Sequence, residues 1–237
     1  MPDVGSAVVV PALAPCRKFS FPRLVQNLRF TRAARLVAPG LVAVVRAPQA
    51  EPVGLLARAL FDGGVEAVEV TTSTPNFEQA IQLARSALGT AGIVGAGTIL
   101  TVEQAKKAIG AGAEFLVSPV FLPELIELAH ANGMPIALGA YTPTECYHAF
   151  RAGADFVKLF PADGLGTSYI RSILAPMPQL PLIPTGGVSV ENIASFFAVG
   201  CKAVGIGGNL VRNEWITQGR WDDLKQIAAQ FRKASGR

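Results

Sequence analysis

The chain has 237 residues, half of them hydrophobic, which is enough for one large domain or two small ones with a substantial core. The net charge of +4 is concentrated in residues 1–35, which hold six basic residues and one acidic residue, whereas the remainder holds 15 basic and 16 acidic residues. The body is thus near neutral without a basic stripe, which argues against nucleic-acid binding. No apolar run approaches the roughly 20 residues of a membrane span, so we expect no membrane partner.

Residues 1–35 form a basic extension ahead of a repetitive body. The extension is rich in arginine and almost free of acids, a composition typical of organelle transit peptides. A plastid or another organelle is then the alternative to a cytoplasmic location. Two other interpretations are a misplaced start codon and a helical extension, in which Leu24 to Val37 form an amphipathic helix that plugs the bottom of a barrel. We therefore divide the chain into this extension and one domain, residues 36–237.

From residue 41 the chain repeats one unit: a short β-branched run, a loop, an amphipathic helix and a Gly-rich turn. Strands that are apolar on both faces and alternate with helices indicate a parallel sheet. Eight such units in roughly 170 residues predict an α/β fold of the (β/α)8 or TIM-barrel type. The expected strands begin 20 to 26 residues apart: Leu41–Arg46, Ala67–Thr71, Ile93–Gly97, Phe115–Ser118, Pro135–Gly139, Phe156–Phe160, Leu182–Thr185 and Ala203–Gly207.

Helical patterns separate these strands, and no linker rich in Pro, Gly and Ser divides the body. The alternative fold is an open doubly wound sheet, but the first strand ends in Arg46 and no GxGxxG motif follows it. The expected helices include Val53–Phe61, Phe77–Leu88, Val102–Ile109, Leu122–Ala131, Thr144–Ala152, Asn192–Val199 and Trp221–Lys233.

The first three strands carry polar side chains toward their carboxyl ends, where the active site of such barrels lies. Arg46 could hold a substrate carboxylate by two hydrogen bonds, and Thr98 could add a hydroxyl. The alternative for Arg46 is a pairing with Glu69 only. An isolated carboxylate in the second strand is costly, so Glu69 is either a proton carrier beside Lys158 or part of a structural salt bridge with Arg46 or Lys158.

Lys158 lies in the middle of the sixth strand, between residues that make both strand faces apolar. An ammonium ion there is costly unless it is paired or has lost its proton. A desolvated lysine with a lowered pKa is a nucleophile that forms Schiff bases with carbonyl substrates. The alternative is a strand-end lysine whose amine reaches water.

Two glycine pairs follow the seventh and eighth strands, in Thr185-Gly186-Gly187 and Gly207-Gly208-Asn209. Glycine lets backbone amides approach an anion, and the loops after strands 7 and 8 are the recurrent phosphate site of these barrels. The alternative is two tight turns that need glycine for a positive φ. Two pairs in the expected loops favour a phosphorylated substrate.

The remaining reactive residue types predict no further chemistry. Cys16, Cys146 and Cys201 are far apart and without CxxC spacing, which indicates a reducing compartment and neither a disulfide framework nor a zinc site. His130 and His148 fall in helical patterns, away from any Asp, Glu or Cys cluster, and we expect both at the surface or in helix packing. We expect no metal site.

Taken together, these residues resemble the 2-keto-3-deoxy-6-phosphogluconate (KDPG) and 4-hydroxy-2-oxoglutarate (KHG) aldolase family over residues 41–233. The order and spacing of several motifs agree at once, which is far more specific than any one of them. The motifs are Val68-Glu69-Val70-Thr71, Val94-Gly95-Ala96-Gly97-Thr98, Val117-Ser118-Pro119, Val157-Lys158-Leu159-Phe160-Pro161-Ala162, Pro184-Thr185-Gly186-Gly187 and Val204-Gly205-Ile206-Gly207-Gly208.

The resemblance implies a class I aldolase without metal or other cofactor, on a barrel that forms homotrimers. By position, Lys158 is similar to the Schiff-base lysine and Glu69 to the proton-transferring residue. Positions around the pyruvyl group are matched by Thr98, Pro119 and Phe160, and the phosphate loops by Thr185, Gly186, Gly187, Gly207 and Gly208.

The chain departs from the family pattern at two positions. Ser73 stands where some members carry an arginine that holds the carboxylate, and Arg46 fits the variant with an arginine at the end of strand 1. Asn209 stands where many members have serine, although its amide can still donate to phosphate. Both departures bear on which substrate is bound.

We therefore expect cleavage of KDPG to pyruvate and glyceraldehyde 3-phosphate. One alternative is an aldolase for 4-hydroxy-2-oxoglutarate or for the galactonate analogue of KDPG. From other classes, the alternatives are a phosphate-binding barrel isomerase or decarboxylase in which Lys158 acts only through its charge, and a barrel that binds a sugar phosphate without chemistry.

Overall fold

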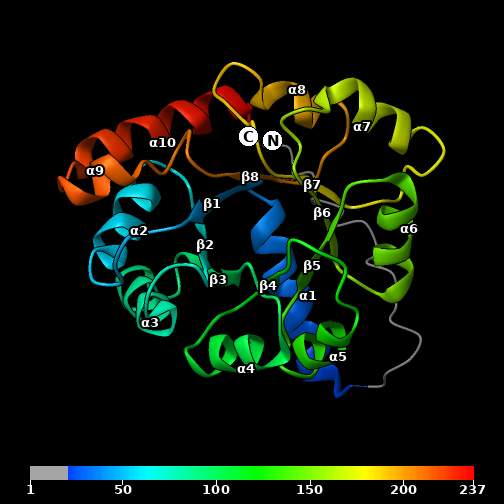
Figure 1. Cartoon of the computed structure of the whole chain (residues 1–237), viewed down its shortest axis with the longest axis horizontal. Helices are drawn as coiled ribbons and strands as arrows, with labels where there is room; N and C mark the ends of the chain where they lie inside the picture. The colour runs from blue at the N-terminus through cyan, green and yellow to red at the C-terminus, as the bar shows by residue number, and fades with distance from the viewer. Residues whose placement is uncertain (1–20) are drawn as a thin grey trace, which may run out of the picture.

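Eight parallel strands alternate with helices and curl into a barrel in the computed structural model, which describes residues 21–237 (Figure 1). Neighbouring strands pair in the order β7-β6-β5-β4-β3-β2-β1-β8, and one parallel bridge between Thr185 and Gly205 joins β7 to β8. The predicted (β/α)8 barrel is confirmed, and the alternative of an open doubly wound sheet is wrong. Cys16 and most of the segment interpreted as a transit peptide lie outside the described residues.

The strands lie where the β-branched runs predicted them, with small differences at their ends. The second and third strands have the predicted bounds, and the fourth is shorter than expected. The strands are β1 (Leu41–Val45), β2 (Ala67–Thr71), β3 (Ile93–Gly97), β4 (Leu116–Val117), β5 (Ile136–Ala140), β6 (Phe156–Leu159), β7 (Leu182–Pro184) and β8 (Val204–Ile206).

The helices surround the barrel, except for α1, which lies within the ring of strands in Figure 1. Two helices, α7 and α9, were not among those expected from the sequence. The helices are α1 (Arg23–Val37), α2 (Val53–Asp62), α3 (Phe77–Leu88), α4 (Val102–Gly110), α5 (Glu124–Ala131), α6 (Pro143–Ala152), α7 (Gly166–Leu174), α8 (Ile193–Ala198), α9 (Asn213–Thr217) and α10 (Trp221–Ser235). None of the helices within residues 21–237 is long and apolar enough to cross a membrane.

Strand side chains point alternately to the helices and to the barrel interior. The outward set joins the helices in one large apolar core. The inward set forms a separate cluster in which Phe115 and Phe156 supply the largest side chains. Burial on both faces is why the strands read as continuous apolar runs.

Helix α1 closes the end of the barrel opposite the predicted active site. Its residues Ala33 and Leu36 are buried within the interior cluster, beside Val42 and Phe115. The helix predicted from Leu24 to Val37 is therefore confirmed, and the predicted domain boundary after residue 35 falls inside it.

A buried polar cluster joins α1 to the barrel wall; it confirms His130 in helix packing but places it beside an acid, which the sequence did not predict. Nη1 of Arg29 lies 2.7 Å from Nδ1 of His130, and Nε2 of His130 lies 2.9 Å from Oδ2 of Asp155. Because a guanidinium can only donate, Nδ1 accepts and Nε2 donates its proton to Asp155. His130 is thus a buried member of an acidic and basic cluster, whereas His148 is exposed as predicted.

Two further arginines of α1 reach a second buried acid, Glu114. Nη1 of Arg35 lies 3.4 Å and Nε of Arg32 lies 4.0 Å from Oε1 of Glu114, and Nη1 of Arg85 contacts the other oxygen, Oε2. Arg35 also donates to main-chain carbonyls in the turn before β3. Arg32 and Arg35 belong to the basic segment whose composition is typical of transit peptides, and they stabilise the closed end of the barrel.

Candidate active site

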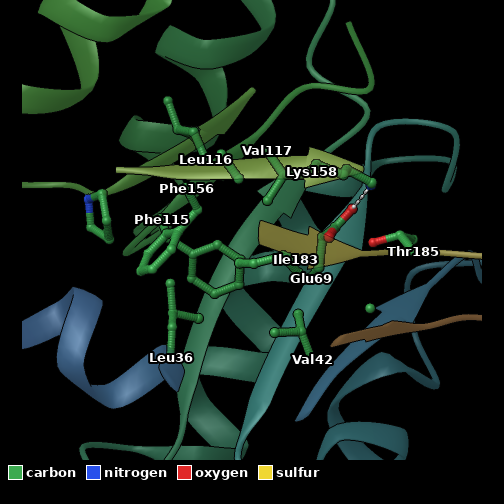
Figure 2. A pocket seen from close by; sticks show the side chains of 13 residues that line it. Leu36, Val42, Glu69, Phe115, Leu116, Val117, Phe156, Lys158, Ile183 and Thr185 are labelled. Carbon is green, nitrogen blue, oxygen red and sulfur yellow. Dashed lines mark hydrogen bonds and ion pairs between the residues drawn. The ribbon is translucent and has the colours of Figure 1, made fainter. Parts of the chain in front are cut away.

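Lys158 and Glu69 meet inside the barrel from opposite strands. Nζ of Lys158, on β6, donates to Oε1 of Glu69, on β2, over 3.3 Å (Figure 2). The two residues are only 5% and 2% exposed. Since a lone buried charge is costly, each side chain makes the burial of the other tolerable. The alternative of a lysine that reaches water is wrong, and Glu69 pairs with Lys158 and not with Arg46.

The interior beneath this pair is filled by apolar side chains. Only a cavity of about 20 Å³ remains there, walled by the interior cluster and by Leu36 of α1 (Figure 2). That space holds no more than a water-sized molecule. A substrate must therefore reach the lysine from the carboxyl ends of the strands.

A cleft of about 480 Å³ opens at those carboxyl ends. Phe160 lines the cleft, and the centre of its ring lies 5.6 Å from Nζ of Lys158. Thr185 lines both the cleft and the interior cavity, and Figure 2 shows its hydroxyl directed toward the Lys158–Glu69 pair. Lys158 and Glu69 line the interior cavity and not the cleft, and Thr185 is the residue that borders both spaces. The cleft brings together these predicted site residues: Arg46, Phe160, Thr185, Gly186, Gly187, Gly207, Gly208 and Asn209.

Arg46 is exposed at the rim of this cleft, directly after β1. Its Nε donates to Oγ of Ser73 over 3.1 Å, so the guanidinium is held by the end of the neighbouring strand. The alternative pairing of Arg46 with Glu69 is wrong. Ser73, which stands where some members of the resembled family carry an arginine, instead accepts a hydrogen bond from Arg46 just after β1.

Thr98 and Pro119 follow β3 and β4, and neither lines the two cavities. Thr98 has a φ of +57°, which is uncommon for a β-branched residue, and its carbonyl accepts a hydrogen bond from Thr72. The backbone of Pro119 packs against Gly139, where a Cβ would overlap it. Gly139, on β5, is the register partner of Lys158 on β6. Pro119 therefore packs against the strand next to the one that carries the lysine.

The two glycine pairs differ in their reason for being glycine. Gly186 and Gly187 have φ values of +104° and +69°, so the turn after β7 requires glycine. Gly207 and Gly208 are not among the residues with positive φ, and a Cβ on either would meet no atom within 4 Å. The turn explanation therefore accounts for the first pair only, and the second pair leaves open space on the cleft wall.

Asn209 and Asp163 add features that the sequence did not predict. Nδ2 of Asn209 donates to the carbonyl of Val188 over 2.8 Å, which ties the β8 loop to the β7 loop. Asp163 lines the cleft, and its Oδ1 lies 3.8 Å from where a Cβ of Gly186 would stand. The sequence signal that could have identified Asp163 is its position just after β6 and Phe160-Pro161-Ala162, at the carboxyl end of the strand that carries Lys158.

Other reactive groups in residues 21–237 lie away from the cleft. Cys146 and Cys201 are buried and unpaired. Within this part of the chain, no group of three or more His, Cys, Asp or Glu side chains is arranged to hold a metal ion.

Comparisons with known proteins agree with this geometry. A family model described as "KDPG and KHG aldolase" matches residues 33–227. The chain is 36% identical to a 2-dehydro-3-deoxy-phosphogluconate aldolase of Treponema pallidum, over 80% of this chain and 90% of that protein. It is 34% identical to a 2-dehydro-3-deoxy-6-phosphogalactonate aldolase of Escherichia coli, over 73% of this chain and 84% of that protein.

A solved structure resembles the barrel closely. The KDPG aldolase of Legionella pneumophila, with pyruvate captured as a covalent carbinolamine intermediate, has a TM-score of 0.76 and 28% identity. The match covers 84% of this chain and 96% of that one. The similarity therefore extends over the whole barrel.

Proposed function

This chain belongs to the KDPG and KHG aldolase family of carbon–carbon lyases, and from that premise we propose that it cleaves KDPG to pyruvate and glyceraldehyde 3-phosphate. The observation that carries the proposal is the buried Lys158–Glu69 pair, in a cavity that shares Thr185 with a cleft whose wall holds the two glycine loops. A covalent pyruvate adduct in the Legionella relative supports the same chemistry here.

The first steps form a Schiff base on Lys158. Glu69 accepts a proton from the ammonium group 3.3 Å away, and the neutral amine attacks the C2 ketone of the substrate. Glu69 then returns the proton to the hydroxyl of the carbinolamine, which leaves as water. The resulting iminium ion draws electrons from the adjacent carbons.

Cleavage uses this iminium ion as an electron sink. Glu69, directly or through a water molecule, removes the proton of the C4 hydroxyl. The C3–C4 bond breaks, its electron pair forms the enamine, and glyceraldehyde 3-phosphate leaves. Protonation of the enamine at C3 and hydrolysis of the iminium then release pyruvate and restore Lys158.

The remaining site residues bind and orient the substrate. Arg46 and Thr98 hold the carboxylate, and Pro119 and Phe160 border the pyruvyl group. The loops Thr185–Gly187 and Gly207–Asn209 hold the phosphate, which the open wall at Gly207 and Gly208 favours. Phe160 also shields Lys158 from water, since its ring lies 5.6 Å from the amine.

A second candidate substrate is an unphosphorylated or epimeric 2-keto acid. Asp163 favours the unphosphorylated acid, because a carboxylate beside Gly186 opposes a phosphate dianion. 4-Hydroxy-2-oxoglutarate is the unphosphorylated substrate to compare, and the galactonate analogue of KDPG is the epimeric one. The E. coli relative named for phosphogalactonate supports the second of these.

Trapping with borohydride tests the Schiff base. The protein is incubated with pyruvate and sodium borohydride, and the mass increment is mapped by peptide mass spectrometry. We expect modification of Lys158, its loss in Lys158→Ala, and normal trapping in Lys106→Ala, a variant of an exposed helix lysine. Absence of an adduct on Lys158 would favour an isomerase or decarboxylase function over the aldolase function.

A substrate panel then tests specificity. Initial rates are compared for KDPG, its galactonate analogue and 4-hydroxy-2-oxoglutarate with coupled detection of pyruvate. The highest kcat/KM for KDPG supports the proposal, and the highest value for either other compound replaces it.

A homotrimer in the cytoplasm completes the proposal. Apolar side chains exposed after β3, β4 and β5 support assembly, namely Leu100 (47%), Val120 (46%), Phe121 (38%) and Tyr141 (41%). The reduced, buried Cys146 and Cys201 support a reducing compartment. Light scattering of the wild type and of Phe121→Glu tests the assembly: a trimer that persists in the variant removes this surface as its interface.

A further inference from the structure

The turn that follows β2 uses four consecutive hydroxyl groups to hold its two neighbouring strands. The residues are Thr71, Thr72, Ser73 and Thr74, which we call the hydroxyl turn. Three of them reach the end of β1, and one reaches the end of β3. Those two strand ends carry Arg46 and Thr98, the residues assigned to the substrate carboxylate.

On the β1 side, the hydroxyl turn fixes the backbone on both sides of Arg46. Oγ1 of Thr71 donates to the carbonyl of Val45 over 3.0 Å, and Oγ1 of Thr74 accepts from the amide of Ala47 over 3.1 Å. Both threonines are 1% exposed, so water does not compete for these bonds. The arginine therefore leaves the strand in one direction.

The side chain of Arg46 is held by a directed chain of hydrogen bonds. Nε of Arg46 donates to Oγ of Ser73 over 3.1 Å, and Oγ of Ser73 lies 2.9 Å from Oγ1 of Thr71. The proton of Thr71 is already used on Val45, so Ser73 donates to Thr71 and accepts from Arg46. With Nε engaged, the two Nη groups form the edge available for a bidentate contact with a carboxylate.

On the β3 side, the hydroxyl turn supports an unusual backbone. Oγ1 of Thr72 donates to the carbonyl of Thr98 over 2.7 Å, and the amide of Thr72 donates to the carbonyl of Gly97 over 2.9 Å. Thr98 has a φ of +57°, a conformation that a β-branched residue adopts only when its surroundings impose it. Thr72 supplies that restraint.

We infer that Ser73 and Thr72 are positioning residues that orient Arg46 and Thr98 for the carboxylate of a 2-keto acid. The inference rests on the proposed function and adds to it the specific groups that set carboxylate affinity. Neither residue touches the reacting atoms: Ser73 acts through Arg46, and Thr72 acts through Thr98. One turn thus aligns groups from two strands against the carboxylate that is attached to the carbon attacked by Lys158.

The test for Ser73 measures borohydride trapping of pyruvate over a range of pyruvate concentrations. In Ser73→Ala the half-saturating concentration should rise about 10-fold, because a hydrogen bond to a charged group is lost. The rate at saturation should change much less. Ser73→Thr, which keeps the hydroxyl, should restore affinity. A purely structural role would instead lower the saturating rate and leave half-saturation unchanged.

A double-mutant cycle isolates the partner. Adding Ser73→Ala to Arg46→Ala should have no further effect on half-saturation, since the serine acts through the arginine. Thr72→Val should likewise raise half-saturation in the wild type but not in Thr98→Gly. The matched control is Ser172→Ala, whose exposed hydroxyl bonds only its own helix, and it should behave as wild type.

The outcomes separate this inference from the proposed function. A wild-type protein that forms no adduct with pyruvate overturns the proposed function. A wild type that traps pyruvate, with half-saturation unchanged in Ser73→Ala and Thr72→Val, overturns the positioning role alone. Full effects that persist in the Arg46→Ala and Thr98→Gly backgrounds overturn the assignment of their partners.

Discussion

The carboxylate of Glu69 occupies the volume that any side chain at position 97 would fill. A Cβ on Gly97 would overlap Oε1, Cδ and Cγ of Glu69, which lies across the β2–β3 pair. Gly97 does not have a positive φ, so its backbone alone does not demand glycine. The glycine at the end of β3 therefore exists to let the acid reach Lys158.

Replacing Gly97 by alanine should displace this acid and abolish catalysis while the barrel remains folded. The added methyl group forces Glu69 into another rotamer and leaves Lys158 without its partner. Because a shift of about 1 Å in a catalytic group can cost 100-fold in rate, we expect a loss of that size. Pyruvate release and circular dichroism measure the two effects.

Two variants make the Gly97 result interpretable. Gly110→Ala, at the end of α4, meets no atom within 4 Å and should leave the rate unchanged. Combining Gly97→Ala with Glu69→Asp shortens the acid and should recover part of the activity. Full activity in Gly97→Ala itself would contradict the steric argument.

Much of the barrel and its reactive centre is readable from sequence because strands and charges leave local signals. The parallel strands are buried on both faces, so each appears as a short apolar run. Lys158 and Glu69 are conspicuous as charges inside such runs, and a barrel brings them together whatever their separation. The prediction needed only the strand pattern and the cost of burying charge.

The features that the sequence did not predict depend on long-range contacts or weak local signals. Arg29 and His130 are 101 residues apart, and neither lies in a recognisable motif. Helix α9 has only five residues, and α7 begins at Gly166 without a side-chain cap, so neither shows a start signal. The hydrogen bond between Ser73 and Arg46 likewise requires the barrel to place β1 beside β2.

Neutralising Asp163 should improve binding of a phosphorylated substrate. Its carboxylate lies beside Gly186 in the loop proposed to hold phosphate, where like charges repel. In Asp163→Asn we expect KM for KDPG to fall about 3-fold, since exposed charge pairs are worth up to about 1 kcal/mol. KM for 4-hydroxy-2-oxoglutarate should not change, and Asp222→Asn on α10 is the matched control. Equal shifts for both substrates would place the phosphate elsewhere.

Helix α1 should be indispensable for folding, which tests the domain boundary proposed after residue 35. Ala33 and Leu36 fill the closed end of the barrel, and their removal exposes the interior cluster to water. A chain that starts at residue 21 should melt cooperatively near the full-length temperature, whereas one that starts at residue 38 should not. Scanning calorimetry measures the melting of both chains. An unchanged melting temperature of the shorter chain would show that α1 is dispensable.

The Arg29–His130–Asp155 cluster should contribute strongly to stability. Asp155→Asn keeps the shape of the side chain but leaves a buried arginine without its counter-ion. Breaking such a pair costs about 3–5 kcal/mol in the free energy of unfolding, measured by urea denaturation. Adding Arg29→Met should recover much of this loss. The exposed Arg58–Asp62 pair is the control, and Asp62→Asn should cost no more than about 0.5 kcal/mol.

The thiols of Cys146 and Cys201 should resist alkylation until the protein unfolds. Burial raises the pKa of Cys146 to about 11 and that of Cys201 to about 12, so the reactive thiolate is scarce at neutral pH. In unfolded chains a thiol ionises near pH 8.5, and the folded protein therefore holds more protons above that pH. Stability from these groups is present below about pH 8.5 and declines as the pH rises toward 11.

In a Cys16→Ser background, iodoacetamide should modify neither thiol at pH 8 without urea and both with urea. Rapid labelling of the native protein at pH 8 would show that one of these thiols is accessible.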